Sequence, residues 1–140
     1  SNLPVMFWIY GGSLKSGWGD LYNGTWLVNA GNVIVVTINY RVGPFGGLAL
    51  KELQQEDSSF PTTGNYFLQD QRLAMHWVRD NIGAFGGNPD DITIFGESAG
   101  AVSACAHFTN NISQPLFQAA IMHSGNCGSQ TLEAGIAIGQ

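Results

Sequence analysis

Charge is scarce in this chain of 140 residues, because Lys, Arg, Asp and Glu together make up only 11% of it, against about a quarter in a typical soluble domain. Five basic and ten acidic residues leave a net charge of −5. This balance argues against nucleic acid as a partner, because nucleic-acid binding needs a basic face. No stretch of the sequence approaches the roughly 20 apolar residues of a membrane span. Composition therefore argues against nucleic acid as a partner and against a membrane span, and decides little else.

Cysteine is also rare, with only Cys105 and Cys127 present. Cys105 lies inside a run of small residues that predicts a helix, where a free thiol behaves as a small buried apolar group. Cys127 follows a predicted strand, in a loop of Gly, Ser and Asn, where its pairing partner could be a cysteine outside residues 1–140. We therefore expect the two cysteines not to pair with each other. We also expect no metal ion and no cofactor.

Glycine, by contrast, is abundant, with 19 residues, and two glycines flank a serine in the most informative stretch, G-E-S-A-G at 96–100. An apolar, β-branched run at 92–95 precedes this stretch, and a small-residue run at 101–106 follows it. A strand, then G-x-S-x-G, then a helix is the context in which α/β-hydrolases hold a serine nucleophile on a strained turn. Ser98 is therefore a candidate nucleophile, and the backbone N–H of Ala99 is a candidate oxyanion donor.

A second glycine-rich turn follows another predicted strand. The continuous apolar run at 5–10 is typical of a strand buried on both faces of a parallel sheet, and Gly11-Gly12-Ser13 follows it directly. Main-chain N–H groups in such a loop can stabilise a developing oxyanion, where one donor is worth about 2.7–4 kcal/mol in a well-studied case. Each motif alone also has an ordinary interpretation, as a tight turn or as a helix N-cap at Ser98. Their combination favours catalysis.

Strands alternate with helices along the chain, which predicts right-handed crossovers and a parallel sheet. We expect the four parallel strands at 5–10, 33–39, 91–95 and 119–123, with an amphipathic helix at 67–81 and a second helix at 98–108. Trp8 and Trp77 fall in buried patterns and are expected in the core. The chain is thus expected to hold part of an α/β-hydrolase fold.

Eight segments together resemble the type-B carboxylesterase/cholinesterase family. They follow the order of that family and lie at 5–12, 39–46, 64–66, 70–74, 77–82, 85–90, 93–100 and 120–125. The resemblance implies an α/β-hydrolase that cleaves small carboxylic esters through an acyl-enzyme.

The resemblance also assigns roles to particular residues. Ser98 matches the nucleophile of the family, and Glu97 matches the acidic residue before it. Gly12, Ser13 and Ala99 match the three positions whose N–H groups form the oxyanion hole. The family usually has glycine where this chain has Ser13. A left-handed conformation there would cost a residue with a Cβ roughly 1–2 kcal/mol.

A complete catalytic triad is missing from this sequence. In α/β-hydrolases the triad runs Ser, then Asp or Glu, then His, but here Glu133 follows both His107 and His123. His76 reads as solvent-facing, and we expect all three histidines to be structural or at the surface. We therefore expect residues 1–140 to be a partial domain that lacks N-terminal strands and the catalytic acid and His. This piece alone is expected to be inactive.

Two functions remain open, a serine carboxylesterase and a non-catalytic cholinesterase-like adhesion or scaffold module. Such modules typically lose the serine, so Ser98 favours the enzyme. Choline specificity is unsupported, because the family tryptophan that would follow residues 124–127 is absent. Two N-glycosylation sequons, at Asn23 and Asn111, favour a secreted or luminal location. The sequence does not define the oligomeric state.

Overall fold

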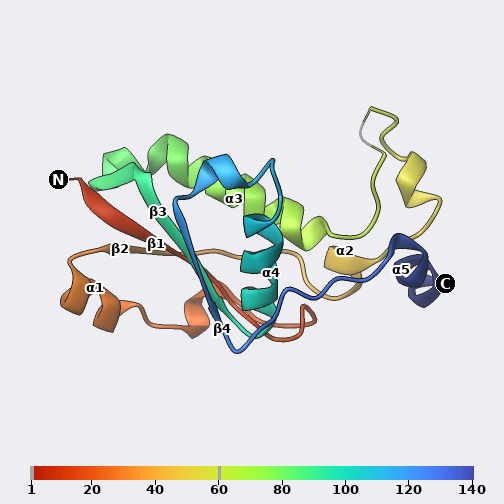
Figure 1. The fold of residues 1–140 in the computed structure, drawn as a ribbon, viewed down its shortest axis with the longest axis horizontal. Helices are drawn as coiled ribbons and strands as arrows, with labels where there is room; N and C mark the ends of the chain where they lie inside the picture. The colour runs from red at the N-terminus through yellow and green to blue at the C-terminus, as the bar shows by residue number, and fades with distance from the viewer. Residues whose placement is uncertain (1, 60) are drawn as a thin grey trace.

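A four-stranded parallel sheet forms the centre of the computed structural model, which describes residues 2–59 and 61–140 (Figure 1). The strand order is β2-β1-β3-β4. The strands are β1 (Leu3–Ile9), β2 (Ile34–Thr37), β3 (Gly87–Glu97) and β4 (Ala119–His123), and the α-helices are α1 (Thr25–Gly31), α2 (Pro44–Gly47), α3 (Tyr66–Asn81), α4 (Ala99–Phe108) and α5 (Leu132–Gly139). Short 3₁₀ turns occupy Gly19–Leu21, Leu53–Gln55, Ile82–Phe85 and Gln114–Leu116. The predicted four-stranded parallel sheet is confirmed.

The strand bounds differ from the prediction mainly in β3. The predicted strand at 119–123 coincides with β4, whereas β3 begins four residues before the predicted 91–95 and ends two residues after it. The early start arises because Gly87 pairs with Leu3, before an irregularity between Leu3 and Val5 shifts the register. The charged and polar residues at the start of β3 hide this pairing from a pattern of apolar residues.

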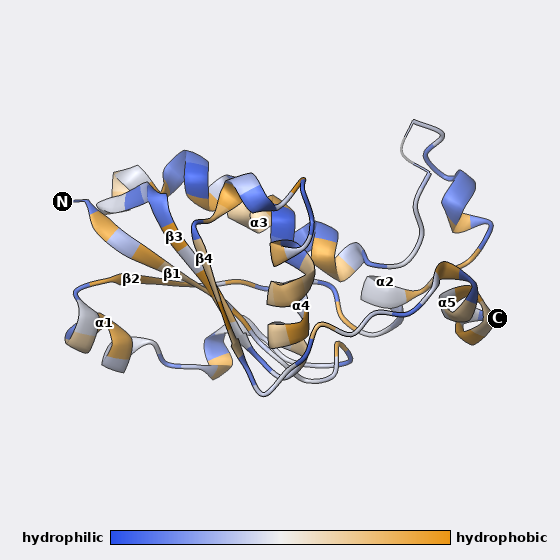
Figure 2. Cartoon of the chain, in the orientation of Figure 1, coloured by the Kyte–Doolittle hydropathy of each residue, from blue (hydrophilic) through white to orange (hydrophobic). Residues whose placement is uncertain are grey.

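Helices α3 and α4 lie together over one face of the sheet, and α1 lies on the opposite side (Figure 1). The central strand β1 is buried on both faces, because the consecutive residues Phe7, Trp8 and Ile9 are all buried. Apolar residues concentrate along the strands and on α4 (Figure 2). This burial explains why the strands read as continuous apolar runs and not as alternating ones.

Helix α3 buries a single stripe of residues. Gln71, Met75, Val78 and, just past the helix, Ile82 are buried, with the spacing that places them on one helical face. Trp77, which we expected in the core, is 53% exposed and contacts the ring of Phe85. The prediction was wrong because consecutive residues lie about 100° apart around a helix, so Trp77 points away from the stripe that contains Val78.

Buried polar side chains join α3 to α4. His107 on α4 is 2% exposed, and its Nε2 and Nδ1 lie 3.0 Å from Gln71 Oε1 and 3.0 Å from Ser113 Oγ. Gln71 Nε2 donates to Ser103 Oγ at 3.3 Å. Burial, together with the charge of Arg72, lowers the pKa of His107 to about 4. His107 is therefore a neutral structural residue, as predicted.

The two cysteines form a disulfide, contrary to the prediction. Cys105 on α4 and Cys127 after β4 are 5.4 Å apart between their Cα atoms. They meet because the chain turns at Ser124, which has a left-handed φ of 56°. The segment that follows then lies against α4. The prediction that the two cysteines do not pair with each other missed this return because it treated the loop after β4 as unconstrained.

The pKa of His107 generates a prediction about stability. Because the unfolded chain binds a proton near pH 6.5 and the folded chain only near pH 4, the free energy of unfolding should fall as the pH drops through this window. The loss attributable to His107 should be about 3 kcal/mol, since each pKa unit corresponds to about 1.4 kcal/mol.

Urea unfolding at pH 7.0 and pH 4.0 would measure this loss in the wild type and in His107→Gln. The loss should shrink in His107→Gln, whose amide cannot titrate, and should stay unchanged in His76→Gln, because His76 is exposed. An equal acid loss in all three proteins would contradict the assignment.

Candidate active site

Ser98 lies at the sharp turn between β3 and α4. Its φ of 56° and ψ of −122° fall in a region that costs a non-glycine residue roughly 1–3 kcal/mol. Ser98 occupies the N-cap position of α4, but its side chain makes no capping hydrogen bond. Its backbone N–H instead donates to the His123 carbonyl at 2.9 Å. The backbone therefore holds the residue in place, and the hydroxyl is not needed as a cap.

The two glycines around Ser98 allow three backbones to meet. A Cβ on Gly100 would overlap the carbonyl oxygen of Ile9, at the end of β1. A Cβ on Gly96 would overlap the backbone of Gly100 and would approach the same Ile9 oxygen to 2.8 Å. Only glycine fits at either position, so the G-x-S-x-G pattern here reflects the crossing of α4 over β1 and β3.

The glycine-rich loop after β1 lies beside Ser98. A Cβ built on Gly11 would lie 3.1 Å from the Ser98 Cβ and 2.6 Å from the Glu97 carbonyl oxygen. Gly12 has a φ of 100°, and Ser13 and Leu14 have φ values of 57° and 60°. The structure therefore brings the 11–14 loop and the Ser98 turn together at the carboxyl edge of the sheet, where open α/β folds bind ligands.

Three backbone N–H groups at this edge are available as donors. Among the described residues, neither the Gly12 N–H nor the Ser13 N–H donates a hydrogen bond. The N–H of Ala99 is in the first turn of α4, where N–H groups have no partner within the helix. The carboxylate of Glu97 lies next to them, with Oε2 3.2 Å from the position of a Gly11 Cβ.

A pair of tyrosines anchors the loop at its start. The Tyr10 hydroxyl donates to the Tyr40 carbonyl at 3.1 Å, and the Tyr40 hydroxyl donates to the Tyr10 carbonyl at 2.5 Å. The two rings stack with their centroids 4.2 Å apart. Because Tyr10 directly precedes Gly11, these two hydrogen bonds fix the point from which the loop departs.

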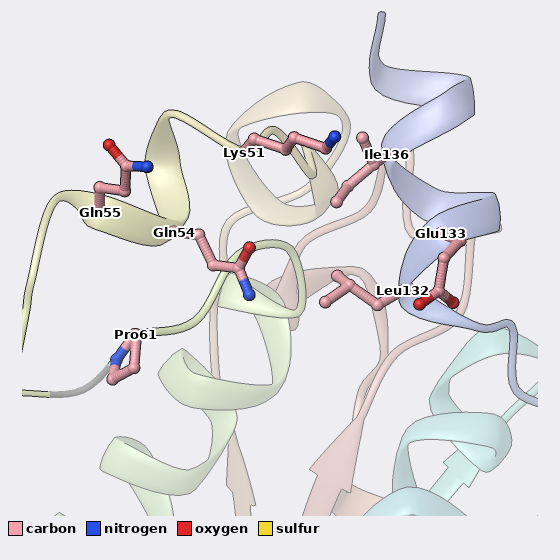
Figure 3. A pocket seen from close by; sticks show the side chains of 7 residues that line it. All are labelled: Lys51, Gln54, Gln55, Pro61, Leu132, Glu133 and Ile136. Atoms are coloured by element: carbon pink, nitrogen blue, oxygen red, sulfur yellow. The ribbon is translucent and has the colours of Figure 1, made fainter.

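No base for Ser98 is seen in the described part of the chain. His107 is engaged with Gln71 and Ser113, and no hydrogen bond between an imidazole and the Ser98 hydroxyl is recorded for residues 2–59 and 61–140. His123, the partner of Glu97 in the sheet register, contributes its backbone carbonyl. Glu133 lies elsewhere, on α5, where it lines a pocket of about 450 Å³ with Lys51 and Gln54 (Figure 3).

A larger cavity of about 820 Å³ lies beside α4. Leu14, next to the candidate oxyanion loop, and Val102, one turn along α4 from Ser98, are among its lining residues. Residues 128–132 also line it. The cavity gives the Ser98 edge of the sheet a mostly apolar neighbouring space.

Other kinds of site find no support among the described residues. No group of three or more His, Cys, Asp or Glu side chains there could hold a metal ion. In the same ranges, no helix is both long enough and apolar enough to cross a bilayer.

Sequence reasoning missed one feature next to the site, the disulfide between Cys105 and Cys127. A signal for it was present. Helix α4 connects the neighbouring strands β3 and β4, so a cysteine on α4 and a cysteine shortly after β4 start on adjacent elements.

The chain matches one protein family and resembles several of its members. A model of the carboxylesterase family matches residues 1–134. The para-nitrobenzyl esterase of Bacillus subtilis is 49% identical over 134 residues, which are 94% of this chain and 26% of that protein. The acetylcholinesterase of Danio rerio is 52% identical over 126 residues, which are 89% of this chain and 19% of that protein.

Solved structures agree with these matches. A thermophilic PNB esterase superimposes with a TM-score of 0.89 at 46% identity and covers 99% of this chain and 28% of its own. A carboxylesterase of Geobacillus stearothermophilus gives a TM-score of 0.90 at 40% identity, with 99% and 29% covered. The predicted α/β-hydrolase fold is confirmed. The chain spans less than a third of the length of these relatives.

The crossing at Gly100 generates a prediction about folding. Gly100→Ala should lower the free energy of unfolding by about 3 kcal/mol or more, because overpacking costs typically 1–3 kcal/mol and the clashing Ile9 oxygen is backbone that cannot rotate away. Gly83→Ala is the matched control, because no atom lies within 4 Å of its new methyl group. Chemical denaturation would measure both variants. Equal stability of the two would show that α4 does not need this close approach.

Proposed function

Because the chain belongs to the carboxylesterase family, we propose that the whole protein is a serine ester hydrolase with Ser98 as its nucleophile. The observation that carries this proposal is the strained turn at Ser98, which lies beside a glycine-rich loop. The Ser98 hydroxyl makes no capping hydrogen bond to α4 there. Relatives named para-nitrobenzyl esterase, acetylcholinesterase and bile salt-activated lipase support ester hydrolysis as the reaction class.

The proposed reaction has two steps. The Ser98 oxygen attacks the ester carbonyl carbon, a histidine outside residues 1–140 takes the hydroxyl proton, and an acid orients that histidine. The tetrahedral intermediate then collapses, and the alcohol leaves with the proton from the histidine. Water attacks the acyl-enzyme in the same way, releases the carboxylic acid and restores the Ser98 hydroxyl.

The N–H groups of Gly12, Ser13 and Ala99 are the proposed oxyanion donors. Two of them lie on the loop after β1 and the third lies at the start of α4, so the negative charge would develop between two elements that the glycine crossing holds together. The N-terminus of α4 adds a favourable dipole at the same point.

The proposed substrate is a small carboxylic ester. Selectivity for choline esters finds no support in these residues, because Trp18 and Trp26 are exposed on the connection before β2 and no tryptophan follows residues 124–127. An adhesion or scaffold module without turnover is the alternative. No contact among residues 2–59 and 61–140 favours it, and the retained Ser98 favours the enzyme.

Removal of the proposed nucleophile is the direct test. In the full-length protein, Ser98→Ala should abolish hydrolysis of short p-nitrophenyl esters and covalent labelling by a fluorophosphonate probe, because it removes the oxygen that would form the acyl-enzyme. Ser59→Ala, in an exposed loop, should keep both. Undiminished hydrolysis by Ser98→Ala would end the assignment.

The left-handed Ser13 gives a second test. Glycine at this position relieves the strain of a φ of 57°, so Ser13→Gly should raise kcat and leave KM nearly unchanged. The gain is bounded by the roughly 1–2 kcal/mol cost of the conformation. Steady-state kinetics of the full-length variant would measure it. A clear fall in kcat would mean that the Ser13 hydroxyl itself assists the reaction.

A further inference from the structure

The chain that leaves β4 lies against the helix that begins at Ser98. His123 accepts the Ser98 N–H at 2.9 Å, so the β3–β4 ladder continues to the candidate nucleophile itself. Two residues later, a Cβ on Gly125 would lie 2.6 Å from the Ala101 Cβ and 2.8 Å from the Ser98 carbonyl oxygen. The segment 123–125 therefore forms one side of the Ser98 turn.

The next residues have little else to hold them. For residues 124–130, the one recorded hydrogen bond other than any within helices and strands is local, from the Gly128 N–H to Asn126 Oδ1 at 3.2 Å. This stretch has no regular secondary structure and is exposed. A loop with few buried contacts and few hydrogen bonds is expected to open at low free-energy cost.

The disulfide supplies the missing constraint. Ala101, which contacts Gly125, and Cys105, which is bonded to Cys127, are four residues apart and lie on the same face of α4. Segment 123–127 thus runs along one face of the helix, held at one end by the His123 carbonyl and at the other by the sulfur–sulfur bond. Cys105 is 2% exposed, so the helix end of the bond is fixed in the core.

We propose that the Cys105–Cys127 disulfide is a positioning element for catalysis, which keeps segment 123–127 on α4 and so holds the Ser98 turn in its reactive geometry. This inference rests on the proposed ester hydrolysis. Its physical basis is the steep dependence of rate on geometry, because a displacement of about 1 Å can cost a reaction on the order of a hundredfold.

The disulfide is expected to have two distinct effects, one on the stability of the fold and one on the rate of catalysis. The bond joins residues with a sequence separation of 22 and restricts the unfolded chain, so its loss lowers stability in any case. A positioning role further requires that kcat falls while the protein is still folded. KM should change less, because the bond acts on the nucleophile and not on a substrate contact.

The test uses the full-length protein with Cys127→Ser, which leaves the buried Cys105 in place. Activity on a short p-nitrophenyl ester and the rate of fluorophosphonate labelling would be measured at a temperature at which circular dichroism shows the variant folded. We expect kcat and the labelling rate to fall together by about tenfold, with KM within about twofold of the wild type. Val78→Ala, a buried substitution on α3, is the control that loses stability and keeps the bond, and its kcat should stay within twofold.

Reduction of the folded wild type gives the same comparison without a substitution, should Cys127→Ser fail to fold. A dithiol gives up two electrons and two protons, becomes a disulfide itself and leaves Cys105 and Cys127 as thiols. We expect the kcat of the wild type to fall on reduction and to recover on reoxidation. If Cys127→Ser folds, the dithiol should leave its kcat unchanged.

Two results would overturn the proposal. One is a folded protein without the bond that keeps wild-type kcat and labelling rate. The other is an equal loss of kcat in Val78→Ala, which would reduce the role of the bond to stability. Absence of Ser98-dependent turnover in the wild type is a different result, because it would end the proposed function as well.

Discussion

The contact on which the rest of the site depends is one of backbone against backbone, where the first turn of α4 crosses the end of β1. Gly100 lies against the Ile9 carbonyl, and Gly96 lies against Gly100. No side chain can enter this contact, so the close approach fixes β1, β3 and α4 relative to one another at the carboxyl edge of the sheet. The loop that follows β1 is thereby brought to Ser98, with Gly11 packed on the Ser98 Cβ. Two motifs that are 85 residues apart in sequence become one site through this crossing.

The sheet could be predicted from sequence because its strands are buried on both faces and read as uninterrupted apolar runs. The choice of the buried stripe on α3 was harder. Leu73 and Trp77 form an apolar pair four residues apart, but both are exposed, and the stripe that contains the polar Gln71 is buried instead. Gln71 can lie inside because His107 and Ser103 satisfy its amide. These hydrogen bonds join residues that are far apart in the sequence, so no local sequence pattern predicts them.

The elements of the site were predictable, but the constraints around it were only partly so. The G-x-S-x-G spacing of Gly96, Ser98 and Gly100 predicts a tight turn. The pairing of Cys105 with Cys127 depends instead on a reversal at Ser124, a non-glycine residue with a φ of 56°. Nothing in the residue type predicts that conformation, because most residues avoid it. The positions of the two cysteines, on α4 and just after β4, make the pairing possible, and the packing of Gly125 on Ala101 brings it about.

Strain and support occur together at this edge of the sheet. Four of the six non-glycine residues with positive φ in the described ranges are Ser13, Leu14, Ser98 and Ser124, all in the loops that follow β1, β3 and β4. Such conformations persist only when the surrounding structure determines them. Here the support comes from the glycine crossing, from the Tyr10–Tyr40 pair and from the disulfide, none of which uses the Ser98 side chain. Because backbone contacts and neighbouring elements hold the Ser98 turn, the Ser98 hydroxyl is not used in a structural hydrogen bond to α4. A nucleophile requires a hydroxyl that is available in this way.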